Sequence, residues 1–307
     1  MLGERIIIPI LKDKAKQPIY EDGPKWHLSK SGTPTMGGLA FVIALGVCLL
    51  ICSGYLFLIG KEDNAVSLLL SVTFSLLNAA VGIIDDMTKL RNNRNAGLTP
   101  KAKLILQFII AFAFLIGRHY ILNDGYHVNL TFGKLDFGIL YYPITLIILV
   151  GIINFANLTD GIDGLASSVA FAIGISLFYI SYSKSDSATF ICAAMIGASV
   201  GFLVYNIHPA KIFMGDTGSL FLGAMVASVA MELKNPLIAV ISGAVYVIEG
   251  VSVILQVAFY KLCKKRIFKM APIHHHLEQC GWEENKICIY AIIITLLFCT
   301  ISKMVYV

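Results

Sequence analysis

The fold of this 307-residue chain is decided by residues 154–166, NFANLTDGIDGLA, and by the apolar segments that flank them. Residues 137–159 and residues 165–183 contain no Asp, Glu, Lys, Arg or His. An α-helix needs about 20 such residues to cross a hydrocarbon layer of about 30 Å. The short polar stretch between the two segments therefore lies at a membrane surface.

The composition of the whole chain also indicates a membrane protein. Hydrophobic residues make up 57% of the chain and charged residues only 14%, with a mean hydropathy of +0.77, whereas soluble domains carry about 25% charged residues. The net charge of +5 is small; an acidic substrate or anionic headgroups would account for it, and no nucleic-acid partner is needed. We interpret the seven cysteines, which form no CxxC pattern, as buried apolar residues.

We predict an all-α polytopic membrane protein with a single domain over residues 1–307, because an open backbone in lipid would leave its amides unpaired. Nine complete transmembrane helices are expected at residues 31–60, 64–84, 104–117, 139–158, 165–183, 188–207, 217–231, 237–260 and 287–307. The apolar residues 6–11 are too few to span and predict a partial first helix. Residues 118–138 predict a small hairpin outside the membrane. The oligomeric state stays open, although lipid-facing helices offer a surface for a homodimer.

Basic residues in the loops predict the orientation. The loops at 12–35, 85–103, 206–218 and 261–286 carry 17 Lys and Arg, whereas the opposite loops carry 5. The basic side should be cytoplasmic and the hairpin periplasmic. The same cytoplasmic face then receives five aspartates and a histidine triplet: Asp85, Asp86, Asp160, Asp163, Asp216 and His274, His275 and His276.

Carboxylates clustered at one membrane face repel one another, so we expect a cation or shared protons among them. Mg²⁺ fits better than zinc, because it takes oxygen ligands, keeps waters and is normally completed by substrate phosphates. Lys30, Lys89 and Lys101 lie in loops on the same side and could hold phosphate charge. Together these groups suggest phosphoryl transfer.

Each motif also has a plainer interpretation. Asp85 and Asp86 could be a solvated helix end, residues 160–164 only a tight turn, and residues 213–218 only a helix N-cap. The amides of Asn154 and Asn157 favour a functional interpretation of the turn. The histidine triplet could be an adventitious tract or a transition-metal site, but three consecutive histidines cannot all face one metal from a helix, so we favour substrate contact.

Glu249 is an ionisable residue inside the predicted span 237–260. Such residues are by default functional. Glu249 shares a helical face with Gln256 at i+7, and both could line an internal groove. The alternative is a protonated Glu249 in a helix–helix hydrogen bond.

Five segments of the chain resemble the bacterial phospho-N-acetylmuramoyl-pentapeptide-transferase (MraY) family. They are KSGTPTMGG at 30–38, DDMTK at 85–89, NLTDGIDGLA at 157–166, FMGDTGSL at 213–220 and MAPIHHHLE at 270–278. They occur in the family's order and cover nearly the whole chain. The aspartate segments are shared by the wider superfamily of polyprenyl-phosphate N-acetylhexosamine-1-phosphate transferases, and the HHHxE tract is similar to the muramoyl-pentapeptide branch in particular.

The resemblance implies ten transmembrane helices in the bacterial inner membrane and a cytoplasmic cleft. There, UDP-MurNAc-pentapeptide and undecaprenyl phosphate would give lipid I and UMP, the first membrane step of peptidoglycan synthesis, with Mg²⁺ as cofactor. A relative that uses UDP-GlcNAc is one alternative. A cation-coupled transporter is an alternative from another class, although we find no inverted repeat and the acids lie at the rim rather than the midplane.

The resemblance also implies roles for individual residues. Asp216, with Asp85, matches the magnesium-binding position, and Asp85 and Asp86 match the paired catalytic aspartates, next to Lys89. The nucleotide would be bound by Lys30, Asn157, Asp160, Gly161, Ile162, Asp163 and Phe213, with the Phe213 ring stacked on uracil. Further substrate-binding positions are Thr35, Lys101, Gln256, His274, His275 and His276. Ile162 stands where leucine is usual, a change that we expect to be harmless.

The hypothesis for the mechanism follows from these roles. Mg²⁺ on Asp216 would bridge the pyrophosphate, Lys89 and Lys101 would offset charge on the transferring group, and the lipid phosphate would attack in line. A phosphate monoester has a second pKa near ~6 and is largely dianionic at neutral pH, so Asp85 is not required as a general base. An aspartyl-phosphate intermediate on Asp85 is the alternative.

Overall fold

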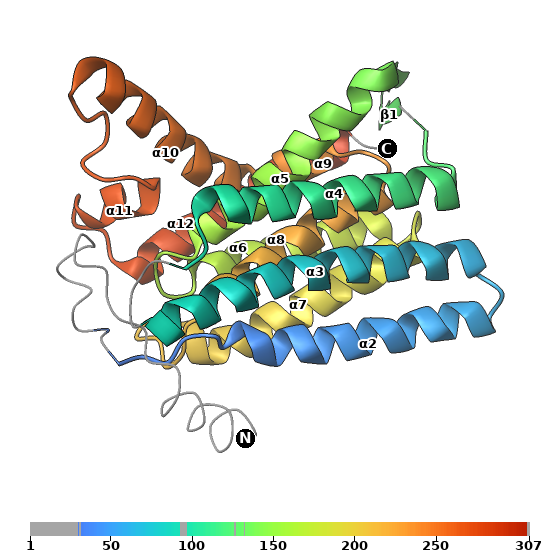
Figure 1. Ribbon diagram of the computed structural model, residues 1–307, viewed down its shortest axis with the longest axis horizontal. Coiled ribbons are helices and arrows are strands. Elements are labelled where there is room, and N and C mark those ends of the chain that lie inside the picture. The colour runs from blue at the N-terminus through green and yellow to red at the C-terminus, as the bar shows by residue number, and fades with distance from the viewer. Residues whose placement is uncertain (1–29, 31, 93–96, 126, 132, 306–307) are drawn as a thin grey trace.

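The computed structural model describes the chain except for residues 1–29, 31, 93–96, 126, 132 and 306–307, so the predicted partial helix at residues 6–11 lies outside the described residues. The described part is a bundle of long helices with one small hairpin (Figure 1). In chain order the elements are α2 (Gly38–Leu58), α3 (Glu62–Asn92), α4 (Pro100–Leu122), β1 (His127–Leu130), β2 (Gly133–Asp136), η3 (Gly138–Leu140), α5 (Tyr141–Thr159), α6 (Leu165–Ser181), α7 (Asp186–Asn206), α8 (Gly215–Glu232), α9 (Leu237–Ser242), α10 (Ala244–Cys263), α11 (Ile273–Glu278) and α12 (Glu284–Val305).

Seven helices of the described part are long and apolar enough to cross a membrane: α2, α3, α4, α5, α7, α10 and α12. Helix α6 is apolar but has only 17 residues. Helix α8 has 18 residues, and every one from Thr217 to Glu232 is buried. The chain is therefore a polytopic membrane protein in which α8 forms the centre of the bundle, and the count of nine spans stays a prediction.

The predicted span 237–260 is wrong as one continuous helix. Gly243 separates α9 from α10. A Cβ atom at Gly243 would lie 2.5 Å from the Ala239 carbonyl oxygen, so the backbone turns tightly at a position without a side chain. Beyond this break α10 diverges from the other helices, toward the end of the bundle where α11 lies (Figure 1).

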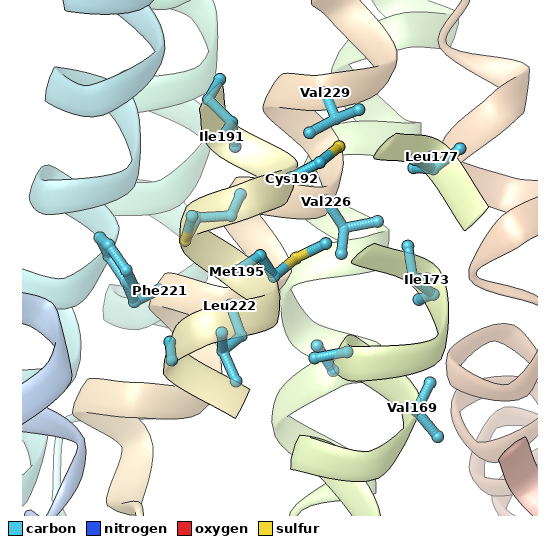
Figure 2. Packing of buried hydrophobic residues seen from close by; sticks show 14 of the residues in the cluster. Val169, Ile173, Leu177, Ile191, Cys192, Met195, Phe221, Leu222, Val226 and Val229 are labelled. Atoms are coloured by element: carbon cyan, nitrogen blue, oxygen red, sulfur yellow. The ribbon is translucent and has the colours of Figure 1, made fainter. Parts of the chain in front are cut away.

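Apolar side chains from α6, α7 and α8 pack the interior of the bundle, with Cys192, Met195 and Val226 between the three helices (Figure 2). These side chains are almost fully buried: Val169, Ile173, Leu177, Ile191, Cys192, Met195, Phe221, Leu222, Val226 and Val229. In a membrane such close packing, rather than transfer from water, holds helices together. The packing fixes α8 between its neighbours.

Glycines allow α2 and α3 to approach the first turn of α8. A Cβ atom at Gly38 would lie 2.4 Å from the Cα atom of Gly218, and one at Gly82 would lie 2.4 Å from the Asp216 carbonyl oxygen. Small residues at helix contacts permit this close approach of backbones. Helices α2, α3 and α8 therefore meet where α8 begins.

The opposite end of the bundle carries the hairpin and a buried ion pair. Strands β1 and β2 pair antiparallel, as predicted, at the end away from α11 (Figure 1). Nearby, Arg118 of α4 contacts Glu232 of α8 with an Nη1–Oε1 distance of 2.9 Å. The hydroxyl groups of Ser67 and Ser71 on α3 donate to the same carboxylate at 2.7 and 2.6 Å. Helices α3, α4 and α8 are thus joined at this end.

We predict that Gly38→Ala destabilises the protein by about 1–3 kcal/mol, the usual cost of inserting a methyl group into a packed interior. Unfolding by SDS titration, followed by circular dichroism, would measure the change. Gly54→Ala on the same helix is the matched control, because a Cβ atom there meets nothing within 4 Å; in a helix this change should stabilise by up to about 1 kcal/mol. Equal stability of the two variants would contradict the close α2–α8 contact.

Candidate active site

Three aspartates meet where α3 ends and α8 begins. One carboxylate oxygen from each of Asp85, Asp86 and Asp216 lies within 4.8 Å of the others. Asp85 and Asp86 are buried, and Asp216 is half-buried. The acids that the sequence places far apart are thus brought together at one end of the bundle.

Asp86 caps the N-terminus of α8. Its Oδ1 atom accepts a hydrogen bond from the Asp216 backbone N–H at 3.1 Å, and its Oδ2 atom accepts from the backbone N–H and hydroxyl of Thr217 at 2.9 and 2.7 Å. Gly215 has a φ of +72°, a conformation that glycine adopts without strain, and a Cβ atom there would meet the Asp86 carboxylate. A carboxylate at this point satisfies free N–H groups and the positive end of the helix dipole. Asp86 therefore fixes the helix that carries Asp216.

Two lysines contact the cluster. The Lys89 Nζ atom lies 2.6 Å from Asp85 Oδ2 and 3.2 Å from Asp216 Oδ2. The Lys103 Nζ atom lies 2.7 Å from Asp216 Oδ2 and donates to the amide oxygen of Asn157 at 3.0 Å. Asn157 in turn donates to Asp216 Oδ1 at 3.1 Å. The two ammonium groups offset the repulsion among the three carboxylates.

Lys103, rather than the predicted Lys101, is the α4 lysine that reaches the aspartates. Lys101 is exposed on the first turn of α4, whereas Lys103 is half-buried. A signal for this choice was present in the sequence. The side chain of Thr99 caps a helix that begins at Pro100, and from that start Lys103 shares one face with the buried Gln107 and Ala111 at i+4 and i+8.

The aspartate cluster fits a hard divalent cation such as Mg²⁺. Its donors are carboxylate oxygens, which this ion prefers, and they are close enough to share one ion. The Asp86 oxygens accept from the backbone of α8, whereas Asp85 Oδ2 and Asp216 Oδ2 contact mobile lysine ammonium groups that a cation could displace. Asp85 and Asp216 are therefore the candidate ligands. Asp85 is oriented by the Leu98 N–H, which donates to its Oδ1 atom at 2.8 Å.

Asp160 follows α5 directly and faces the same cluster. Burial of its carboxyl group, together with the negative charges of Asp216, Asp86 and Asp163, raises the pKa of Asp160 to about 8. At neutral pH the carboxyl group is therefore largely protonated. A cation placed among these aspartates would favour its ionised form.

A second charged cluster surrounds Asp163. The Lys30 Nζ atom lies 2.7 Å from Asp163 Oδ1 and 2.8 Å from Glu284 Oε2. His208 Nδ1 lies 2.9 Å from Asp163 Oδ2. These groups connect the segment before α2, the α5–α6 loop, the α7–α8 loop and the start of α12. Asp163, His208 and Glu284 also lie close enough to share a metal ion. This group includes a histidine nitrogen, whereas the aspartate cluster offers only carboxylate oxygens, the ligands that Mg²⁺ prefers. The sequence had not indicated His208 or Glu284.

The predicted residues Thr35 and Phe213 lie on adjoining loops. The Phe213 N–H donates to the Pro34 carbonyl at 2.8 Å, and the Gly37 N–H donates to the Phe213 carbonyl at 2.8 Å. Thr35 is buried next to Gly215, and the Phe213 side chain is half-buried. The loop before α2 is therefore fixed to the loop before α8.

Gln256, together with His275 and His276 of α11, forms hydrogen bonds that stabilise the segment between α10 and α12. Gln256 Oε1 accepts from the N–H groups of Ile267 and Phe268, both at 3.0 Å. His275 Nδ1 lies 2.6 Å from Glu278 Oε2, and His276 Nδ1 accepts from the Lys269 N–H at 3.2 Å. In this structure these polar atoms hold the segment together.

His274 is fully buried, in contrast to its neighbours. Its Nδ1 atom lies 3.0 Å from Glu249 Oε2, and its backbone N–H donates to the same oxygen at 3.2 Å. Its ring lies over Gly161. Ile162, one residue later, is buried in the apolar core. Glu249 thus pairs with a histidine of α11 rather than lining an open groove.

Sequence comparisons with known proteins match this chain to transferases along nearly its whole length. Residues 65–234 match the sequence model of glycosyl transferase family 4, and residues 30–42 match the phospho-N-acetylmuramoyl-pentapeptide-transferase signature 1. The chain is 47% identical over 303 residues to the phospho-N-acetylmuramoyl-pentapeptide-transferase of Clostridium perfringens (strain 13 / Type A), covering 97% of this chain and 92% of that protein. The enzymes of the same name from Caldicellulosiruptor bescii and Carboxydothermus hydrogenoformans are 42% and 41% identical, over 97% and 98% of this chain and 91% and 93% of theirs.

We predict that Asp86→Ala destabilises the protein by about 1–3 kcal/mol, because it leaves buried donors at the start of α8 unpaired. SDS-induced unfolding would measure the loss. Glu62→Ala is a suitable control, since Glu62 is an exposed acid in the first turn of α3. An unchanged unfolding midpoint for Asp86→Ala would show that the cap contributes nothing to the fold.

Proposed function

The chain belongs to the phospho-N-acetylmuramoyl-pentapeptide-transferase family, and from this membership we infer that it transfers phospho-N-acetylmuramoyl-pentapeptide to a lipid carrier. We propose UDP-MurNAc-pentapeptide as donor, undecaprenyl phosphate as acceptor, and lipid I and UMP as products. The observation that carries this proposal is the group of three aspartates and two lysines at one end of a membrane-spanning bundle. Such a group suits the transfer of a phosphoryl group between a soluble nucleotide and a lipid.

Asp85 and Asp216 are the proposed ligands of Mg²⁺. When bound, the ion would neutralise negative charge on phosphate oxygens, which is its usual contribution to phosphoryl transfer. Asp86 has a different task. Its oxygens are bonded to Asp216 N–H and to Thr217, so it positions Asp216 without contacting substrate.

Lys89 and Lys103 are the proposed phosphate-binding cations. Both Nζ atoms contact Asp216 Oδ2, and both would exchange part of this contact for phosphate oxygens when substrate enters. A lysine ammonium binds phosphate as a mobile point charge, which suits a group that must follow the transferring phosphorus. Lys103 takes the role that the sequence assigned to Lys101.

The acceptor needs no general base in this proposal. A phosphate monoester with a second pKa of about 6 is mainly a dianion at neutral pH. Asp85 Oδ2 lies 2.6 Å from the Lys89 Nζ atom and Oδ1 accepts from the Leu98 N–H, so both oxygens that could attack phosphorus are already in contact with donors. Direct in-line attack by the lipid phosphate is therefore the route that the surrounding groups favour over an aspartyl-phosphate on Asp85.

The nucleotide is proposed to bind at the loops around Lys30, Asp163 and Phe213. The ion pair of Lys30 with Asp163 sets the loop before α2 against the α5–α6 loop. Phe213 has a half-buried side chain on the loop before α8, which is hydrogen-bonded to the loop before α2, and an aromatic face can stack on a base. We propose that this end of the bundle faces the cytoplasm from the inner membrane, and the excess of basic residues in its loops supports this orientation.

A transporter is the less favoured function. Its ion-binding acids would lie near the middle of the membrane, whereas the aspartate cluster lies at helix ends: Asp216 is the second residue of α8, and Asp85 and Asp86 are in the last turns of α3. A transferase that uses UDP-GlcNAc is less favoured by the names of the relatives.

We predict Mg²⁺-dependent release of UMP from UDP-MurNAc-pentapeptide when purified protein is mixed with undecaprenyl phosphate. UDP-GlcNAc should release none above background, which tests the donor. Removal of Mg²⁺ with EDTA, or the change Asp216→Asn, should abolish release because the proposed ligand set is lost. Full activity of Asp216→Asn would remove its metal-binding role, and absence of UMP with either donor would overturn the proposed reaction.

We predict that Lys103→Met lowers kcat by about 100-fold, the usual loss when one preorganised charge is removed from a transition state. Lys101→Met is the matched control. Lys101 is exposed and two residues away on the same helix, so kcat should stay within about twofold of wild type because an exposed charge contributes little. The reverse order of the two variants would restore the assignment of Lys101 made from the sequence.

A further inference from the structure

Glu249 and His274 form a buried pair outside the aspartate cluster. Glu249 lies on α10 and is 3% exposed, and His274 lies on α11 and is 0% exposed. One oxygen of Glu249 accepts both the backbone N–H of His274, at 3.2 Å, and a hydrogen bond from its ring Nδ1, at 3.0 Å. The carboxylate therefore fixes both the backbone and the ring orientation of His274.

The ring of His274 packs directly on Gly161. A Cβ atom built on Gly161 would lie 2.2 Å from His274 Nε2 and 2.8 Å from its Cε1 atom. No residue other than glycine fits there while the ring keeps its place. Nε2 has no hydrogen-bond partner among the described residues, so the ring holds the loop by steric contact rather than by a hydrogen bond.

Gly161 lies in the chain between Asp160, beside the aspartate cluster, and Asp163, the centre of the second charged cluster. The preceding residue, Asp160, is close enough to Asp216 and Asp86 for their charges to act on it. Two residues later, Asp163 pairs with Lys30. A shift of Gly161 would therefore move Asp160 relative to the aspartate cluster and Asp163 relative to Lys30 in the proposed nucleotide site.

Helix α10 diverges from the bundle (Figure 1), and the Glu249–His274 pair links it to α11. Gln256, two turns after Glu249 on the same face, holds the loop at Ile267 and Phe268. Glu249 binds the backbone N–H of His274 in α11, the helix that follows this loop. The contact of His274 with Gly161 then joins this segment to the α5–α6 loop.

We propose that Glu249 is a positioning residue of the transferase site. It holds His274 in place, and the His274 ring in turn holds the Asp160–Asp163 loop, so that the pair controls how well the nucleotide sugar binds. The proposal rests on the proposed function. It assigns His274 a support role in place of the substrate contact expected from the sequence.

The test compares Glu249→Leu with Glu249→Gln. Leucine removes the acceptor for both His274 donors, so KM for UDP-MurNAc-pentapeptide should rise by about tenfold or more, with a smaller fall in kcat, as expected when binding geometry is lost. Glutamine keeps one acceptor oxygen of similar position and should restore KM to within about threefold of wild type. Calorimetric titration with UMP alone gives a second readout, and its dissociation constant should follow the same order.

Gly161→Ala tests the same contact from the other side. The added methyl group occupies the place of His274 Nε2, so this variant should reproduce the higher KM even if Glu249→Leu does not fold. Gly151→Ala on α5 is the control, because a Cβ atom there meets nothing within 4 Å; its KM should equal that of wild type.

Failure of the positioning role and failure of the proposed function would give different results. Wild-type protein that releases no UMP would overturn the proposed function itself. Active wild type with an unchanged KM in folded Glu249→Leu or in Gly161→Ala would overturn the positioning role. Equal defects in Glu249→Gln and Glu249→Leu would also overturn it, because they would show that the negative charge, and not the held geometry, is what matters.

Discussion

Repulsion among three carboxylates at one end of the bundle is the constraint on which the arrangement of the helices depends. Two unit charges 4 Å apart repel by about 4 kcal/mol at an effective dielectric constant of about 20, and Asp85, Asp86 and Asp216 are closer than 5 Å to one another. Two lysines and the free N–H groups at the start of α8 offset this repulsion. Each compensating group lies near a helix terminus, so α3 must end where α4 and α8 begin. The glycine contacts at the start of α8 serve this requirement, because any side chain there would separate the helices.

The same three helices are also joined at their other ends. Glu232, the last residue of α8, is bonded to Arg118 of α4 and to Ser67 and Ser71 of α3. Sixteen residues separate it from Asp216, or about 24 Å along the helix at 1.5 Å per residue. A buried carboxylate is tolerated only when it is fully paired, so this cluster allows little sliding of the helices. Charges at both ends thus fix the register, and apolar side chains fill the space between.

The long apolar segments of the sequence predicted most of the helices, and turn residues predicted the hairpin. The helix ends were predicted less well: α3 continues to Asn92 and α4 begins at Pro100, so Lys89 and Lys101, which we expected in loops, lie in helices. It failed where structure depends on pairs distant in the chain. No local signal distinguishes Asp86, which caps a helix 130 residues later, from Asp85 beside it. The hydrogen bond from the Asp163 backbone N–H to the Glu284 carboxylate spans 121 residues and was equally hidden. By contrast, Lys103 could have been chosen over Lys101 from the helix start at Pro100 and the buried face that follows. The break at Gly243 was missed because hydropathy does not change across it.

The histidine triplet shows why a motif cannot be assigned one role. Adjacent residues of a helix point in different directions, and the three histidines of α11 accordingly contact different groups, among them Glu249, Glu278 and the Lys269 N–H. Only His274 faces the interior, where its ring meets Gly161. In the structure the three histidines make separate contacts, and substrate contact by His275 and His276 stays a prediction. The loops of the site lie outside any regular element, and it is through such attachments that a rigid helix such as α10 can determine where they lie.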